Sequence, residues 1–374
     1  MKVITDYKMH SLGEKINEAL TPAELKRLKS ELKIHCDEVG SDFDEVCKLL
    51  KIQAGSLSKL DRKQVEWLNS VCSSGWEVND STGKIDVETY QTLIRSGNLI
   101  DGEIPYDIEF GVIRGTFRTD GSGLKSFRGF PEKIYGDLNI SGNDLESLEG
   151  CTQEVMGTFN CSNNKNLKSL EGGPKLVRDA YNCSSNIGLE NLEGSPEKIG
   201  GRFQANDCSL KSLKGAPKEV GGDFYCNDNY LTTMKGAPER IDGNSVYCRG
   251  NRLYSLEGLP LDYRGRVECS KNLFPEEVLR SVYANAKKYD SWTAAYLVLI
   301  TTKRFQRMSK EQRDPIRDVL TGDALRSKSL ELSSIWKDPI MEDPAIKRMI
   351  KRAQLGKDVI QDVELGSDLK DIGF

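Results

Sequence analysis

A leucine returns along the middle of the chain at a nearly constant interval. It falls every 21 or 22 residues, at Leu124, Leu145, Leu167, Leu189, Leu210, Leu231 and Leu253. Around it each repeat follows one pattern of apolar and polar positions, V/I-x-G-x-F-x-C-x-x-N-x-L-x-S-L-x-G-x-P. A fixed period in this range is typical of a solenoid, in which each repeat forms one turn. The pattern therefore predicts a stack of similar turns around one apolar interior.

The F-x-C segment of each repeat predicts a short strand. Alternate residues of a strand share a face, so we expect Phe159 and Cys161, for example, to point into the interior together. Such strands, stacked about 4.8 Å apart, would form a parallel sheet. The paired leucines, such as Leu167 and Leu170, are expected to fill the interior on the return path. Glycines such as Gly172 would allow the tight bends.

A polar residue follows each of these strands at a constant distance. It is an asparagine in six repeats, at Asn143, Asn164, Asn186, Asn229, Asn251 and Asn272. In the repeat that begins at Leu189 the same position holds Cys208. We expect these side chains to bond backbone groups where the chain leaves the strand. The segment F-x-C-x-x-N-x-L resembles the leucine-rich-repeat pattern L-x-L-x-x-N/C-x-L, which implies a leucine-rich-repeat-like solenoid.

A hairpin and an incomplete repeat precede the regular ones. Residues 76–88 alternate apolar and polar positions around the turn sequence N-D-S-T-G, which predicts a β-hairpin. Phe117 and Thr119 then occupy the Phe and Cys positions of a first turn. Because an open turn would expose the interior, we expect residues 76–123 to cap this end.

Helical patterns flank the repeats on both sides. They lie before the hairpin at 21–32, 41–52 and 60–72, and after the repeats at 275–289, 291–300, 309–320, 325–336 and 343–355. The first begins with Thr21, Pro22 and Glu24, which predicts a capping box. The sequence thus predicts an α+β chain with three domains. These are a helical N-terminal domain at 1–75, the solenoid with its cap at 76–273, and a helical C-terminal domain at 274–374.

Composition narrows the classes of partner. The chain of 374 residues has a net charge of −4, so no basic field favours nucleic acid or an anionic membrane. The basic run Lys347–Arg352 is surrounded by acidic residues, and we interpret it as a solvated helix face. The longest apolar run, at 294–300, is too short to span a bilayer, and the N-terminus shows no secretory signal. We expect neither a membrane nor a nucleic acid as partner.

The ten cysteines are expected to be free thiols of a reducing compartment. The Cys position of the repeats also holds Ile140 and Ala205, which bind no metal, so we interpret the column as buried packing. The sequence contains only two histidines, no phosphate-binding loop and no G-x-S-x-G or H-E-x-x-H motif. GGDF at 221–224 is one copy of a repeated position. We therefore expect no metal, no cofactor and no enzyme activity.

Residues beside the inward Phe and Cys are expected on the concave face of the sheet. Early repeats place small polar residues there, such as Thr158, Asn160 and Ser162. Later repeats place larger ones, and the predicted partner-binding stripe consists of Arg202, Gln204, Tyr225, Tyr247, Arg249 and Arg266. Tyrosine and arginine dominate the energetics of protein interfaces. Two alternatives are an ordinary solvated face with ion pairs between strands, and contact with the chain's own helices.

The repeats and their cap together resemble poorly characterised repeat proteins of large tailed bacteriophages. Those contain strings of S-L-x-G-x-P-x-x-V-G-G-x-F-x-C-x-x-N-x-L behind a W-x-V-x-x-x-x-G-x-I/V-D-V cap. The cap elements here are Trp76, Val78, Gly83, Ile85, Asp86 and Val87. The resemblance covers residues 76–273 and implies a viral protein of the host cytoplasm or the virion.

Three hypotheses for the function follow. The first is a non-catalytic phage protein whose solenoid serves as a protein–protein interaction or assembly surface. The second is a structural component of the virion, associated with capsid, neck or tail. The third is an enzyme hidden in a helical flank. We favour the common core of the first two, which is binding or assembly with a phage or host protein.

Overall fold

The computed structural model describes residues 7–18, 22–49, 60–72, 75–88, 91–300, 302, 305 and 307–319. Its contacts divide the chain into two units. The first comprises Met1–Ser209 and Gly215–Gly222, and the second comprises Leu210–Lys214 and Asp223–Phe374. This division falls within the repeats, so the three domains expected from the sequence stay a prediction.

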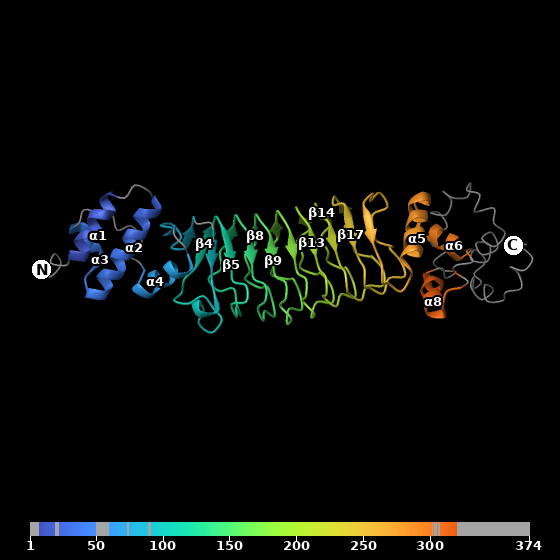
Figure 1. Cartoon of the computed structure of the whole chain (residues 1–374), viewed down its shortest axis with the longest axis horizontal. Helices are drawn as coiled ribbons and strands as arrows, with labels where there is room; N and C mark the ends of the chain where they lie inside the picture. Colours follow the sequence, from blue (N-terminus) through green and yellow to red (C-terminus); the bar gives the residue numbers. More distant parts are fainter. Residues whose placement is uncertain are drawn as a thin grey trace, which may run out of the picture. The chain divides into compact units, whose positions relative to one another are not determined.

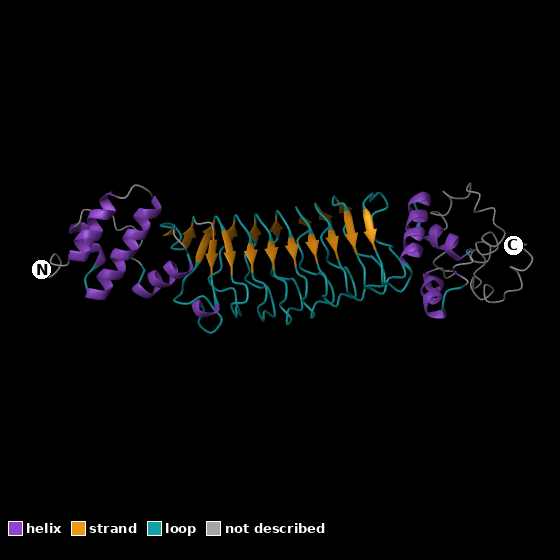
Figure 2. Ribbon diagram, in the orientation of Figure 1, coloured by secondary structure: helices purple, strands orange, loops and turns teal. Residues whose placement is uncertain are grey.

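The repeats form a parallel β-solenoid of about nine turns, with two short strands in each turn (Figures 1 and 2). We call them the F-x-C strands and the V/I strands, after the repeat positions they occupy. In the first unit the F-x-C strands and their forerunners are β3 (Gln91–Leu93), β5 (Thr116–Arg118), β7 (Leu138–Asn139), β9 (Phe159–Asn160), β11 (Tyr181–Asn182) and β13 (Phe203–Gln204). In the second unit they are β15 (Phe224–Tyr225), β17 (Ser245–Tyr247) and β18 (Arg266–Glu268).

The V/I strands form the second column. They are β2 (Ile85–Val87), β4 (Phe110–Ile113), β6 (Lys133–Ile134), β8 (Glu154–Val155), β10 (Leu176–Val177), β12 (Lys198–Ile199) and β14 (Glu219–Val220) in the first unit, and β16 (Arg240–Ile241) in the second. The hairpin expected at 76–88 is confirmed, because β1 (Trp76–Val78) pairs antiparallel with β2. A short 3-10 helix, η2 (Ser96–Asn98), follows β3.

The V/I strands correct the expectation of one parallel sheet. Val155, Val177 and Ile199 are buried and stand in parallel register, each next to an outward residue. The return path after the F-x-C strands consists of turns and loops, without a helix in residues 124–273 (Figure 2). The predicted solenoid is confirmed in this form. Its identity as a leucine-rich repeat stays a prediction.

The aromatic residues of the F-x-C strands build the interior as predicted. Phe159, Tyr181 and Phe203 are fully buried and lie in parallel register on β9, β11 and β13. The centroid of the Tyr181 ring is 5.0 Å from that of Phe159 and 5.4 Å from that of Phe203. In the second unit Phe224 and Val246 occupy the same position in register. Each unit therefore has an apolar interior that runs from turn to turn.

The asparagines bond the backbone where the chain leaves the strand, as predicted. The side-chain amide of Asn186 donates to the carbonyls of Cys183 (2.7 Å) and Cys161 (3.1 Å), and its Oδ1 accepts from the backbone N–H of Asn164 (2.7 Å). Cys208 occupies the asparagine position of its repeat, and its thiol, a weaker donor than an amide, lies 3.1 Å from the carbonyl of Cys183. Each asparagine thus joins one turn to the next.

Helices in the first unit are α1 (Tyr7–Glu18), α2 (Pro22–Val39), α3 (Phe43–Leu49) and α4 (Arg62–Val71). The first three share a small core that includes Leu28, Leu32 and Phe43. Helix α4 begins at a capping box formed by Asp61 and Gln64. The expected cap at Thr21 lies outside the described residues.

Helix α4 covers the first turn of the solenoid. Its Trp67 ring lies 6.3 Å from the ring of Phe110 between centroids, and the Trp67 indole N–H donates to the carbonyl of Asn98 (2.6 Å). Val65, Leu68 and Val71 of the same helix are buried. Helix α4 therefore covers this end of the solenoid in addition to the hairpin expected as the cap.

In the second unit the described helices are α5 (Glu276–Tyr289), α6 (Trp292–Ile300) and α8 (Lys310–Val319). Helix α5 covers the last turn, because Arg280 donates to the carbonyl of Val267 (2.9 Å) and the Tyr283 hydroxyl to that of Pro260 (2.6 Å). The helices expected at 325–336 and 343–355, and the basic run Lys347–Arg352, lie outside the described residues.

Candidate interaction surface on the F-x-C strands

In the first unit the outward residues of the F-x-C strands are small and polar. Asn139, Asn160 and Asn182 stand in register between the buried residues of β7, β9 and β11. Each Oδ1 accepts the backbone N–H of the serine two residues later, at 3.0 to 3.1 Å. These side chains are therefore held by their own turns, which agrees with the expected character of the early repeats.

In the second unit the same position carries two stacked tyrosines. Tyr225 and Tyr247 stand in register on β15 and β17, with ring centroids 4.4 Å apart and planes 6° from parallel. Both are half-buried, and the hydroxyl of Tyr225 donates to Asp223 Oδ2 (3.3 Å). An aromatic pair of this kind contributes about 0.5–1.5 kcal/mol beyond its buried area. The rings are thus ordered before any partner arrives.

Arginines of the second unit lie beside this tyrosine pair. The Arg249 guanidinium is 4.0 Å from Asp228 Oδ2, and its side chain is 55% exposed. Arg266 forms an ion pair with Glu268 two residues later on β18. Exposed pairs of this kind contribute only about 0–1 kcal/mol to stability. These two ion pairs are compatible with the alternative interpretation of the face as an ordinary solvated surface. They also leave the guanidinium groups of both arginines accessible to a partner.

Two further residues lie in the turns that follow β15 and β17, and the sequence analysis missed them. The guanidinium of Arg252 lies 4.7 Å from the centre of the Tyr230 ring, and Tyr230 is 46% exposed. Tyr230 and Arg252 each come directly after the buried asparagine of their repeat. A comparison of the residues that follow this asparagine in all repeats would have revealed them. We define the tyrosine–arginine surface as Tyr225, Tyr230, Tyr247, Arg249, Arg252 and Arg266.

The expected stripe falls into two sets. Tyr225, Tyr247, Arg249 and Arg266 belong to the second unit, where adjacent strands bring them together. Arg202 and Gln204 flank Phe203 on the first unit, with Arg202 exposed and Gln204 half-buried. Binding by any of the six stays a prediction, as does the concave shape of the face.

The thiols have little nucleophilic character. All ten cysteines are buried. Burial raises the pKa of nine of them, at positions 36, 47, 72, 151, 161, 183, 226, 248 and 269. A hydrogen bond from Cys183 lowers the pKa of Cys208 instead. Within the described ranges, no group of three or more His, Cys, Asp or Glu side chains is placed to hold a metal ion.

We expect the buried thiols to make stability fall in alkaline solution. Burial raises the pKa of Cys72 from 9.0 to about 12. The folded state holds the thiol proton more tightly than the unfolded state does, and this difference stabilises the fold. The contribution is complete below pH 9 and is lost as the pH rises from 9 toward 12. Cys72→Ala removes one such group. Its free energy of unfolding, from urea titrations between pH 9 and 10.5, should fall less steeply than that of the wild type, by about 1.1 kcal/mol per pH unit on average. Identical slopes would contradict this assignment.

Comparisons with protein-family models, with curated proteins and with solved structures gave no match to this chain. None of the helices in the described part of the chain is both long enough and apolar enough to cross a membrane. The chemistry of the tyrosine–arginine surface is therefore the basis on which a function can be argued.

Proposed function

We propose that this chain is a non-catalytic binding protein whose solenoid holds a recognition surface for another protein. The observation that carries the proposal is the accessible stack of Tyr225 and Tyr247 with Arg249 beside it. Tyrosine and arginine are enriched among the residues that contribute most to protein–protein binding. Both present apolar area and hydrogen-bonding groups, which suits a surface that is exposed until the partner binds.

The rigidity of the scaffold supports this function. Binding costs free energy when side chains and loops must be ordered at the interface. Here the backbone beneath the tyrosines is paired between β15, β17 and β18, and the rings already pack on each other. The surface would therefore lose little conformational entropy when it is covered.

The proposed setting is a bacteriophage infection, with a phage or host protein as the partner. This part rests on the resemblance of residues 76–273 to phage repeat proteins. Quantitative mass spectrometry of purified particles tests it. Near-stoichiometric copies would place the surface in the virion, where binding serves assembly. Absence from particles would place it in the host cytoplasm.

We expect the double variant Tyr247→Ala/Arg249→Ala to lose its partner while staying folded. Removal of the stack costs about 0.5–1.5 kcal/mol, which lowers the melting temperature only slightly. Loss of two central anchors typically costs 2 kcal/mol or more each in binding, on the order of a thousandfold in affinity. The measurement is capture by the immobilised full chain from extracts of infected cells, with the captured proteins quantified by mass spectrometry.

The matched control is Asn160→Ala/Ser162→Ala, which truncates the outward residue of β9 and the serine two residues later, both in the first unit. It should retain every protein that the wild type captures. The binding proposal fails if the tyrosine–arginine variant captures the same proteins in the same amounts as the wild type.

A further inference from the structure

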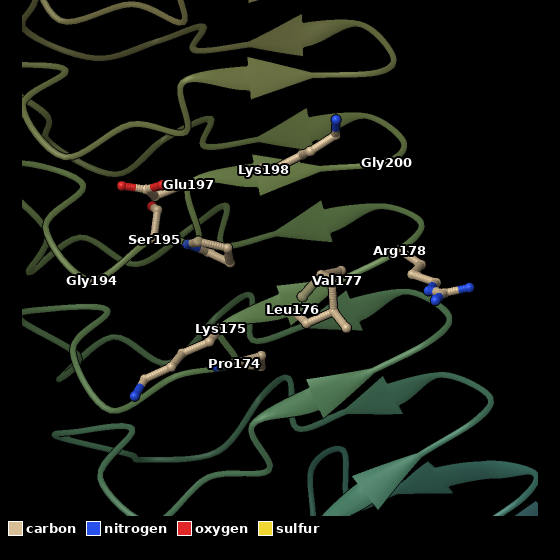
Figure 3. Close-up of a pocket in the computed structure, with 11 residues that line it drawn as sticks. Pro174, Lys175, Leu176, Val177, Arg178, Gly194, Ser195, Glu197, Lys198 and Gly200 are labelled. Carbon is tan, nitrogen blue, oxygen red and sulfur yellow. The ribbon is translucent and has the colours of Figure 1, made fainter.

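A second surface lies on the V/I strands of the first unit, where a groove of about 630 Å³ runs along β10 and β12 (Figure 3). It is lined by residues 174–178, 194–198 and 200. The groove uses outward residues of a different strand column from the tyrosine–arginine surface. Its chemistry is also different, because its centre is aliphatic and its margins are cationic.

Leu176 makes the centre of the groove apolar. The outward position it occupies holds charged residues in neighbouring V/I strands, namely Lys133, Glu154, Lys198 and Glu219. These form cross-strand ion pairs, Lys133 Nζ to Glu154 Oε2 at 2.7 Å and Lys198 Nζ to Glu219 Oε2 at 2.8 Å. Leu176 interrupts this series and is 38% exposed. A single exposed leucine is common on protein surfaces, but this one lies inside a groove.

The charges that line the groove do not balance. Three of its residues are cations, Lys175, Arg178 and Lys198, and one, Glu197, is a carboxylate, so the lining carries a net charge of 3 − 1 = +2. Glu197 is already bonded to Lys218 Nζ at 2.9 Å, and Lys198 to Glu219. Lys175 and Arg178 form no ion pair with any described residue. In a chain whose net charge is −4, this is a local excess of positive charge.

The two unpaired cations flank the aliphatic centre. Lys175 immediately precedes β10 and Arg178 immediately follows it, and Figure 3 shows their side chains at opposite ends of the strand, with Leu176 between them. Three residues of extended chain span about 10 Å. A peptide in the polyproline II conformation has three residues per turn, so the side chains of residues i and i+3 share a face about 9 Å apart, with residue i+1 between them along the axis. Two carboxylates so placed would match Lys175 and Arg178.

We propose that this groove binds an acidic peptide segment of a partner protein, in which an aliphatic side chain is flanked by two carboxylates. The aliphatic side chain packs on Leu176, and the carboxylates pair with Lys175 and Arg178. The opposite charges attract the segment, and the apolar contact selects among acidic segments. This site does not depend on the tyrosine–arginine surface, so the two can be tested separately.

The test uses the full chain and two labelled synthetic peptides, SELAES and SQLAQS, in a fluorescence anisotropy titration at low salt. We expect SELAES to bind about tenfold more tightly, which corresponds to about 1.4 kcal/mol for its two charge contacts. The double variant K175Q/R178Q should bind SELAES about tenfold more weakly than the wild type. Leu176→Ser should weaken SELAES and SQLAQS alike, because both contain the same leucine. Added salt should reduce the preference for SELAES.

The matched control is K165Q/K168Q, which removes the same charge from two exposed lysines that do not line the groove. It should bind SELAES as the wild type does, and both variants should unfold at the wild-type urea concentration. Three results would each overturn the proposal. They are equal affinity for the two peptides, an equal loss of SELAES binding in K175Q/R178Q and K165Q/K168Q, and binding of single-stranded RNA without binding of SELAES.

Discussion

Gly194→Ala is expected to destabilise the solenoid by about 4 kcal/mol or more, because the substitution combines two costs. The backbone at Gly194 has φ +96°, a conformation that L side chains rarely adopt. An added Cβ would also lie 2.1 Å from the backbone nitrogen of Glu171 in the preceding turn. Backbone atoms of a stacked turn cannot move aside without breaking the pairing of that turn. Urea denaturation followed by circular dichroism measures the effect.

Two other glycines separate the costs. Gly83 has φ +75° but open space around the added Cβ, so Gly83→Ala tests backbone strain alone, at about 1–2 kcal/mol. Gly97 has neither a positive φ nor a close neighbour, and Gly97→Ala should be neutral or slightly stabilising. If Gly194→Ala cost no more than Gly83→Ala, close packing of successive turns would not be the reason for the glycine in each repeat.

Asn186→Ala is expected to cost about 4 kcal/mol for a different reason. The substitution leaves the buried backbone N–H of Asn164 without an acceptor. It also removes one of two donors from each of two buried carbonyls, since Cys161 keeps the Asn164 amide and Cys183 keeps the Cys208 thiol. Each lost hydrogen bond costs about 1 kcal/mol. An orphaned buried polar group costs about 1–3 kcal/mol. The loss is measured as the difference in the free energy of unfolding between the variant and the wild type, each obtained from a urea titration.

The chain offers a control for this prediction as well. Asn182 is an outward asparagine only four residues earlier, bonded to the backbone N–H of Ser184, and Asn182→Ala should cost less than about 1 kcal/mol. Asn186→Cys should fall between the two, because Cys208 shows that a thiol can approach one of the carbonyls. Equal costs for Asn186→Ala and Asn182→Ala would refute the role of the buried asparagines in joining turns.

The candidate site was predictable only in part. Tyr225 and Tyr247 were identified because strand alternation places the residue between two buried ones on the outside. The stacking of their rings could not be predicted in this way, because it depends on the register between β15 and β17. Arg252 and Tyr230 were missed because they follow the strands, where no alternation applies. The groove at Leu176 was missed because it lies on a strand that was not expected.

The sequence by itself determined the repeat and what lies inside it. The repeats have a period of 21 or 22 residues, and the equivalents of Phe159 and Cys161 stand at constant positions in them. Neighbouring repeats must bury these apolar side chains against each other, so the pattern predicts a stack of turns. Only the tertiary structure decided that each turn has two strands. A two-residue segment such as Leu176–Val177 has one buried side chain, so it carries no alternation to recognise. It becomes a strand when the turns before and after it supply backbone partners 22 residues away in the sequence. Those partners are in place only once the chain has folded.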